Sequence, residues 1–384
     1  MEKVRFLAFY LPQFHPIKEN DQWWGPGFTE WTNVVKAKPL FRGHVQPRIP
    51  ANLGFYDLRL PETREQQADL AKEAGIEGFC YYHYWFGNGR QLLERPFEEV
   101  LHTKKPDYPF CLCWANHSWE SKTWTNAKRK VAGTMIMKQE YPGEQDNLEH
   151  FRYLLPAFKD PRYIKVDGKP LFVIYDPFGF ENVSGFIEQW RILAKENGLK
   201  DFHFVAIVQT VTMQIAVEAK NNKDKWDELI AARVNQALDF GFDAVTTDNR
   251  NGAQILSRGV LNTALHSFCS QKLGFDFAHK FKQETINKNW FLKVDAMENV
   301  YPSILPNWDR TPRSKSDSIY VDSTPDVFYD FARKAIELVN NKEPEHRIVF
   351  LKSWNEWGEG NYMEPDQQYG DGYIKALAKA CKGL

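Results

Sequence analysis

Short apolar runs alternate with longer amphipathic segments along most of the chain. Several runs are nearly continuous in β-branched and aromatic residues, which is typical of parallel strands covered on both faces. The expected strands are residues 4–10, 77–85, 110–116, 171–176, 202–208, 242–247, 299–306 and 347–354, of which the seventh is the weakest.

The segments between these runs carry helix signals. PETREQQADLAKEAG (61–75) opens with Pro61, places acids in its first turn and ends at Gly75. TPDVFYDFARKAIELVNNK (324–342) begins with Thr324 as N-cap, followed by a proline. Eight strands that alternate with helices predict an α/β fold, the (β/α)8 TIM barrel.

The sequence indicates one domain over residues 1–384. It shows no repeat of fixed period and no low-complexity linker, and α/β barrels of this length commonly fold as one unit. The longest irregular stretches are 11–60 and roughly 117–150, which follow the first and third expected strands. Loops on that side of a barrel build the active site, so we expect long substrate-binding loops at the C-terminal face of the strands.

Composition narrows the range of partners. The chain is 43% hydrophobic and 26% charged, and its 49 basic residues balance 50 acidic ones. No basic surplus points to nucleic acid, and no run of 18 apolar residues points to membrane insertion. The first 16 residues lack the apolar region of a signal peptide, so we expect a cytoplasmic protein, or a periplasmic one if a leader has been removed. Nothing in the sequence indicates an oligomeric state.

The cysteines indicate neither a disulfide framework nor a metal site. Cys80, Cys111 and Cys113 lie in apolar strand-like runs, where thiols behave as small core residues. Cys111 and Cys113 are separated by one residue, which is not the spacing of a zinc knuckle. We therefore expect buried reduced thiols and no metal.

Polar and aromatic residues gather at the expected strand ends. They are Tyr10, His15, His83, Tyr84, Trp114, Asn116, His117, Tyr175, Asp248, Trp308 and Asp309. Rings offer apolar faces to a sugar, while amides, imidazoles and carboxylates suit its hydroxyl groups. An aromatic content of 15%, with 13 Trp, exceeds what core packing needs. The pattern predicts an oligosaccharide or polysaccharide as the partner.

The stretch NEWGEGNYMEPD (355–366) follows the eighth expected strand and holds Glu356 and Glu359 three residues apart. In a helical turn such side chains are neighbours, on the order of 5–6 Å between Cβ atoms. Glycosidases use two carboxylates, one as acid and one as base or nucleophile. The alternative is that both glutamates cap loops or form ion pairs at the rim.

Four motifs resemble the WbsX-like family, which is related to glycoside hydrolase family 99. They are AFYLPQFHPIKENDQWWGPGFTEWTNV, GFCYYHYWF, LPAFKDPRYIKVDGKPLFVIYDP and SWNEWGEGNYMEPD, and the likeness runs from residue 6 to about 371. The resemblance implies a (β/α)8 barrel and a role in bacterial surface polysaccharides. Family 99 comprises retaining endo-acting α-mannosidases that need no metal.

The resemblance also implies roles for the acid pair. Glu356 would deprotonate the sugar 2-hydroxyl, which displaces the leaving group through an epoxide-like intermediate, and Glu359 would serve as acid and base. Asn355 and Trp357 of the same motif become candidate substrate contacts. Gly358 departs from the pattern, because family 99 usually has histidine there.

Other candidates have structural alternatives. A substrate contact competes with a core or lid role for His15, His83, Glu30, Trp31, Trp114, Tyr175 and Trp308. Glu364 would either contact substrate or orient a neighbouring tryptophan or arginine. Asp248 and Asp309 are expected to form ion pairs.

Three function classes remain at this stage. The first is a hydrolase of α-linked, mannose-containing bacterial or dietary polysaccharide, which requires no cofactor. The second is a glycosyltransferase of surface polysaccharide synthesis, although the sequence lacks D-x-D, G-x-G-x-x-G and P-loop motifs. The third is a noncatalytic carbohydrate-binding barrel, which would keep the aromatics without needing both glutamates.

Overall fold

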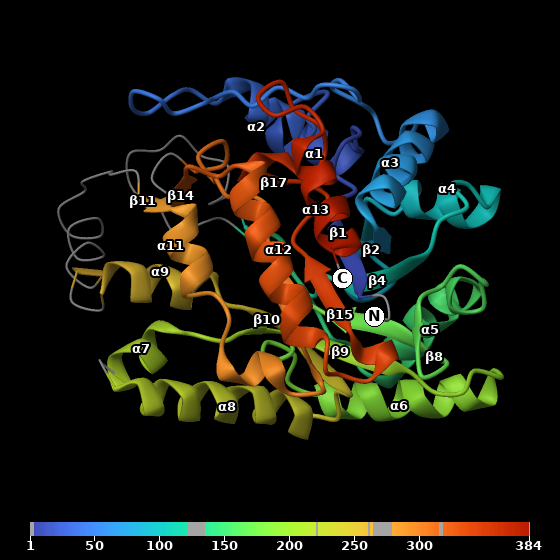
Figure 1. Ribbon diagram of the computed structural model, residues 1–384. Helices are drawn as coiled ribbons and strands as arrows, with labels where there is room; N and C mark the ends of the chain where they lie inside the picture. The colour runs from blue at the N-terminus through green and yellow to red at the C-terminus, as the bar shows by residue number, and fades with distance from the viewer. Residues whose placement is uncertain are drawn as a thin grey trace.

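The computed structural model describes residues 4–120, 135–219, 222–259, 262–263, 279–314 and 318–383. Its centre is a parallel sheet rolled into a barrel and surrounded by helices (Figure 1). Neighbouring strands follow the order β12-β10-β9-β8-β4-β2-β1-β15-β13. The longer strands are β1 (Arg5–Tyr10), β2 (Ile76–Trp85), β4 (Phe110–Trp114), β8 (Lys169–Ile174), β9 (His203–Gln209), β10 (Ala244–Asp248) and β15 (Ile348–Leu351).

The barrel closes through its seventh strand, which is interrupted. β12 (Val300–Tyr301) pairs with β10, and β13 (Ser303–Ile304) pairs with β15. Pro302, between them, has no N–H to donate, but its carbonyl accepts a 3.0 Å hydrogen bond from the Phe350 amide. Each half of this strand therefore pairs with one neighbouring strand. The expected strand at 299–306 and the α/β-barrel class are both confirmed.

Helices follow the strands and cover the barrel. They are α3 (Pro61–Ala74), α4 (Arg95–Thr103), α5 (Glu144–Phe158), α6 (Val183–Glu196), α7 (Met213–Ala219), α8 (Lys223–Asp239), α9 (Arg250–Arg258), α11 (Gln283–Lys288), α12 (Pro325–Val339) and α13 (Gly372–Lys382). Helix α3 ends at Gly75, whose φ of 85° suits glycine, and Thr324 caps α12 by accepting from the Val327 amide. Both helix boundaries expected from the sequence are confirmed.

Short elements complete the chain. They are β3 (Gln91–Leu92), β5 (Trp119–Glu120), β6 (Met135–Met137), β7 (Lys165–Val166), β11 (His279–Lys282), β14 (Ser318–Val321), β16 (Asn355–Glu356) and β17 (Asn361–Tyr362), with 3-10 turns η2 (Lys293–Ala296), η3 (Pro344–His346) and η4 (Trp357–Glu359). Within the described ranges, no helix combines the length and apolarity that crossing a membrane requires.

An aromatic layer joins the barrel wall to its helices. Trp190 of α6 is fully buried, with ring centroids 5.0 Å from Phe172 and 5.5 Å from Phe202. Cys80, Cys111 and Cys113 are buried free thiols, as the sequence predicted. The outer face of these strands thus packs closely against the helices.

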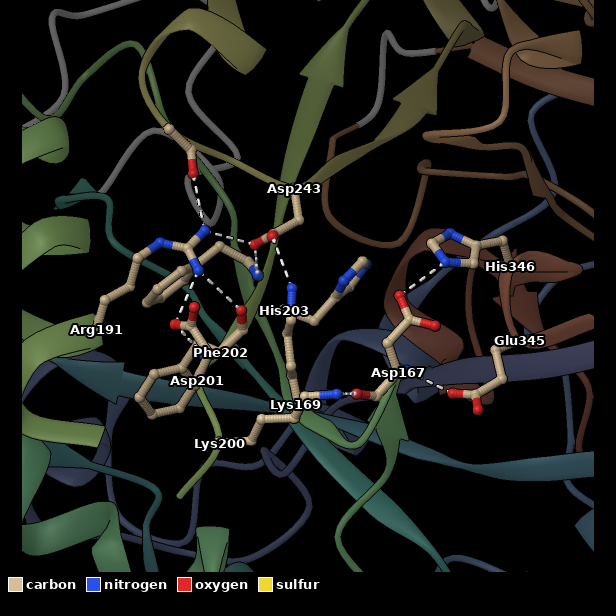
Figure 2. Close-up of polar contacts among 12 residues, drawn as sticks. Asp167, Lys169, Arg191, Lys200, Asp201, Phe202, His203, Asp243, Glu345 and His346 are labelled. Carbon is tan, nitrogen blue, oxygen red and sulfur yellow. Dashed lines mark hydrogen bonds and ion pairs between the residues drawn. The ribbon is translucent and has the colours of Figure 1, made fainter. Parts of the chain in front are cut away.

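The end where the strands begin is held by ion pairs (Figure 2). Asp243, next to the start of β10, accepts from Arg191 at 2.7 Å and from the Phe204 amide at 2.9 Å. His346 contacts Asp167 at 3.0 Å. This end of a barrel contributes to stability. The network fastens strands and helices together at the end away from the acid motif, residues 355–366.

The long segment after β1 packs over the acid motif. It carries α1 (Lys18–Trp24) and α2 (Trp31–Lys36), which lie near β17 in Figure 1. The Trp31 ring is 5.4 Å from that of Trp357, and the Ala51 amide donates to the Pro365 carbonyl at 2.9 Å. The expected position of this loop at the C-terminal face is confirmed. Much of the second expected loop, residues 121–134, lies outside the described residues.

Trp190→Ala should lower the free energy of unfolding by about 3–5 kcal/mol, because it removes a fully buried ring and leaves a cavity. Urea denaturation followed by circular dichroism measures this change. Ile192→Ala, on the same helix but 52% exposed, is the matched control and should change stability by less than about 0.5 kcal/mol. Equal losses in the two variants would contradict the proposed packing.

Candidate active site

The acid pair is positioned by a short hairpin after β15. Strands β16 and β17 pair antiparallel, and η4 forms the turn between them. Glu356 precedes the 3-10 turn and Glu359 ends it, and side chains three residues apart in such a turn eclipse one another. Gly360 then turns the chain with a φ of 54°, where an added Cβ would lie 2.7 Å from the Cβ of Asp309. The backbone thus points both carboxylates to one side.

One guanidinium holds both carboxylates. Nη1 of Arg313 lies 3.0 Å from Oε1 of Glu356 and 2.8 Å from Oε1 of Glu359. Nε of Arg313 donates to Glu30, which is fully buried, at 2.9 Å. Since both catalytic candidates contact one nitrogen atom, the two oxygens are at most about 6 Å apart, so both carboxyl groups belong to one site.

The pKa values of the two carboxyl groups are shifted in opposite directions. Burial and the charge of Glu359 raise the pKa of Glu356 to about 7, against the pull of Arg313. Burial also acts to raise the pKa of Glu359, but four cations outweigh it and lower that pKa to about 2; they are Arg313, Arg310, Arg250 and Lys352. These shifts favour the proton of the pair on Glu356. The resemblance to family 99 gives the acid role to Glu359, and that assignment stays a prediction.

The carboxylates face a cavity of about 490 Å³ at the C-terminal ends of the strands. Each of the longer strands, together with β13, contributes residues to its wall. The residues at strand ends are Leu11 and Gln13 after β1, Tyr82 and Tyr84 of β2, Ala115 and His117 after β4, Tyr175 after β8, Gln209 of β9, Arg250 after β10, Arg310 and Arg313 after β13, and Lys352 and Glu356 after β15. Trp24, Trp119 and Glu120 add to the rim.

Five of the sequence candidates line this cavity. They are Tyr84, His117, Tyr175, Glu356 and Glu359. The remaining candidates, all of them described residues, do not: Tyr10, His15, Glu30, Trp31, His83, Trp114, Asn116, Trp308, Asn355, Trp357 and Glu364. Direct substrate contact by these eleven is not supported, although several of them hold cavity residues in place.

His83 and Trp114 point outward, which corrects their assignment. Side chains of a strand alternate between its faces, and Tyr82 and Tyr84 face the cavity, so His83 faces the helices. Its Nε2 lies 2.9 Å from Nε2 of His150, and burial lowers the pKa of His83 to about 3. The Trp114 indole donates to the Trp85 carbonyl at 2.9 Å. The alternation would have selected Tyr82, which the sequence reasoning missed.

Glu364 anchors the hairpin. Its carboxylate accepts from Trp357 at 2.6 Å, Gln67 at 2.6 Å and Tyr56 at 2.9 Å. Burial raises the pKa of Glu364 to about 7, in opposition to these bonds. Of its two expected roles, the structure supports the orientation of a tryptophan. Tyr10 joins this network because its hydroxyl donates to Gln67 at 2.7 Å.

Asn355 and Trp31 link the hairpin to the segment after β1. Asn355 bonds both the amide and the carbonyl of Leu11, at 2.7 and 3.0 Å. The Trp31 indole donates to the Tyr56 carbonyl at 2.8 Å, and its ring packs on Trp357. These residues support the site from behind, and their assignment as substrate contacts is corrected.

The other three candidates have local structural partners. Asn116 bonds the backbone N and O of Asp176 and so ties the end of β4 to the end of β8. His15 is buried, lies 3.0 Å from the Pro12 carbonyl and has its pKa lowered to about 4 by burial. The Trp308 indole donates to Ser318 at 2.9 Å, and its ring stacks under Arg250 at 4.2 Å. Trp308 therefore positions a cavity cation.

The cations are the main feature that sequence reasoning missed. Arg250 and Lys352 both contact Asp248, at 2.7 and 2.9 Å, and Arg310 contacts Glu359 at 3.1 Å. The expected ion pair of Asp248 is confirmed. That of Asp309 is confirmed too, with Arg48 at 3.9 Å, and His44 contacts the same carboxylate at 2.8 Å. The available signal was position, because Lys352 directly follows β15 and Arg250 lies two residues after the end of β10.

Within the described part of the chain, no three or more His, Cys, Asp or Glu side chains are grouped so that they could hold a metal ion.

A barrel with two buried glutamates in an aromatic cavity is an architecture of carbohydrate-active enzymes. The family described as Glycosyltransferase WbsX matches residues 6–377, so the chain belongs to this family of carbohydrate-active enzymes. The WbsX-like resemblance of the motifs is thereby confirmed.

Two curated relatives are uncharacterised WxcX proteins of two strains of Xanthomonas campestris pv. campestris. Each is 34% identical to this chain, over 376 and 378 residues that make up 97% of it. The matches cover 49% of each relative, so the chain spans about half their length.

Solved structures support the fold. A glycoside hydrolase-like protein superposes with a TM-score of 0.58 and 15% identity, covering 99% of this chain and 94% of that one. The GH99 endo-alpha-mannosidase from Bacteroides thetaiotaomicron superposes with a TM-score of 0.51 and 15% identity, covering 100% and 98%. At this identity the likeness concerns the barrel itself, and it confirms the expected relation in fold to family 99.

Gly358→Ala should destabilise the protein by about 1–3 kcal/mol, because the new Cβ would lie 1.7 Å from Oε1 of Glu30 and force the Glu30–Arg313 pair apart. Urea denaturation measures the effect. Gly383→Ala, where the nearest atom is 3.5 Å from the new Cβ, is the control and should be neutral. A neutral Gly358→Ala would contradict the clash.

Proposed function

We propose that the cavity binds an α-linked glycan and that Glu356 and Glu359 hydrolyse its glycosidic bond. The observation that carries this proposal is the acid pair itself, two buried carboxyl groups that share the Arg313 guanidinium and whose pKa values lie near 7 and near 2. A glycosidase needs one protonated and one ionised carboxyl group at the same bond.

The cavity wall suits a sugar. Tyr82, Tyr84 and Tyr175 present rings for stacking, and His117 adds an imidazole. Trp24 and Trp119 extend the aromatic surface at the rim. Mannose-containing bacterial or dietary polysaccharides are the first substrates to test, because the fold resembles that of an endo-alpha-mannosidase.

The charges assign different tasks to the two acids. Glu356 donates its proton to the departing oxygen, and ionised Glu359 receives the proton of the 2-hydroxyl as that oxygen displaces the leaving group at C1. Water then opens the epoxide-like intermediate, Glu356 takes a proton from the water and Glu359 returns its proton to the 2-oxygen. Two inversions at C1 leave its configuration unchanged, so the proposed reaction is retaining.

Glu356→Gln should lower cleavage of a natural glycan by about 10²- to 10⁴-fold, yet largely spare an aryl glycoside whose leaving group needs no proton. Glu359→Gln should impair both substrates, because the displacement fails. Steady-state kinetics on both substrates test this division, with Glu337→Gln on the exposed face of α12 as a control that stays active. If Glu359→Gln keeps aryl-glycoside cleavage and Glu356→Gln loses it, the two glutamates have the opposite roles. If both variants keep full activity, the pair is excluded from catalysis.

The pH profile gives a second test. The folded pKa of Glu356 lies near 7, so its proton is present below that pH and is lost as the pH rises through it. We expect kcat/KM of the free enzyme to fall above about pH 7. An activity that instead rises from pH 6 to pH 8 would contradict proton donation by Glu356.

A glycosyltransferase is the second candidate, favoured by the description of the family and by the four cations that line the cavity. Incubation with UDP- or GDP-sugars and acceptor glycans, beside a panel of α-linked mannans, separates the classes. Consumption of a sugar nucleotide without glycan cleavage would favour the transferase. Binding of glycans without either reaction would favour a carbohydrate-binding barrel.

A further inference from the structure

Charge is distributed unevenly around the cavity. Beside the acid pair, Arg313 and Arg310 face Glu30, Glu356 and Glu359. At the ends of β10 and β15, two cations share one carboxylate: Arg250 contacts Asp248 through Nε and Nη2, and Nζ of Lys352 contacts the same carboxylate at 2.9 Å. Glu120, the other acid of the wall, comes from β5 after β4. By direct contacts among the described residues, this part of the wall holds two cations against one carboxylate, and Glu359 is the next acid that their charge reaches.

These cations are fixed and poorly hydrated. The side chain of Lys352 is 7% exposed and that of Arg250 is 17% exposed. Arg250 is held from below by the Trp308 ring, 4.2 Å from its guanidinium carbon. A charge removed from water is weakly screened, so a nearby ligand anion interacts with it more strongly than with a surface lysine.

The proposed reaction makes such cations unfavourable for a neutral substrate. Glycosidic cleavage passes through an oxocarbenium-like state in which positive charge develops on the sugar ring. Arg250 and Lys352 line the same cavity and directly contact a single carboxylate, so together they repel that charge. An anionic group on the substrate, bound against the cations, would offset the repulsion while leaving Glu356 and Glu359 free for the bond.

We infer that the sugar bound in this cavity carries a negatively charged group, a carboxylate or a phosphate, which Arg250 and Lys352 hold with Arg310 beside them. Gln209, at the end of β9, supplies an amide to the same wall. This inference rests on the proposed function in that the ligand is a sugar. A carboxylate would belong to an acidic polysaccharide, and a phosphate to an activated sugar.

The test compares three ligands built on one sugar: methyl α-D-mannoside, methyl α-D-mannosiduronate and α-D-mannose 1-phosphate. Binding to the wild-type protein is measured by calorimetry at low and high NaCl. We expect at least one anionic ligand to bind about ten-fold or more tightly than the neutral one, and most of this preference should persist at high salt because the two cations are buried and weakly screened. If the uronate binds more tightly than the phosphate, the natural ligand is an acidic polysaccharide. If the phosphate binds more tightly, the natural ligand is an activated sugar.

Lys352→Met is the decisive variant, because it removes one charge, keeps the apolar stem and leaves the Arg250–Asp248 pair in place. It should abolish most of the preference for the anionic ligand without weakening the neutral one. Lys375→Met is the control, since Lys375 also pairs with an aspartate at 2.9 Å but lies 68% exposed on α13. Its affinities should equal those of the wild type.

Equal affinity for neutral and anionic ligands, no binding of either anionic ligand, or a preference that survives Lys352→Met would overturn the inference. Its failure is distinguishable from that of the proposed function. If the protein cleaves neutral glycans and shows no preference for anionic ligands, only the proposed anion site is refuted. If the protein binds anionic ligands selectively but cleaves no glycan, the hydrolase assignment is refuted and the proposed anion site stands.

Discussion

The site depends on one buried guanidinium. Arg313 lies between Glu30, which is fully buried on the segment after β1, and the two carboxylates of the hairpin after β15. These segments are more than 300 residues apart in the chain, so the contact fixes the long first loop onto the acid motif. Buried ion clusters add little net stability, but the loss of one partner leaves uncompensated charge. The cluster is therefore best understood as a device that sets geometry and protonation.

That arrangement separates two carboxyl groups that are chemically identical. Glu359 is surrounded by cations and stays ionised, whereas Glu356 is buried beside an ionised neighbour and keeps its proton up to about pH 7. The difference comes from environment and not from residue type. The same cations connect the chemistry to specificity, because charges that tune an acid also select what binds next to it.

A second set of contacts keeps the hairpin rigid. Glu364 collects three donors behind the acid pair, and Asn355 bonds both backbone groups of Leu11. Neither Glu364 nor Asn355 lines the cavity, yet Asn355 is next to Glu356 and Glu364 follows Glu359 by five residues. Motif residues that look like ligands in a sequence can thus serve the motif's own backbone, since a precise acid pair needs a support that does not move.

The sequence by itself determined the barrel, the presence of a seventh strand and the place of the acid pair, whereas the break in that strand appeared only in the structure. The first three depend on local signals: apolar runs, helix caps and a motif that directly follows a strand. It did not separate cavity residues from core residues at the strand ends, where His83 and Trp114 proved to face the helices. Only the tertiary structure decided that, together with the cations around Glu359, because the direction of a side chain depends on strand register and a pKa depends on charges that are distant in the chain.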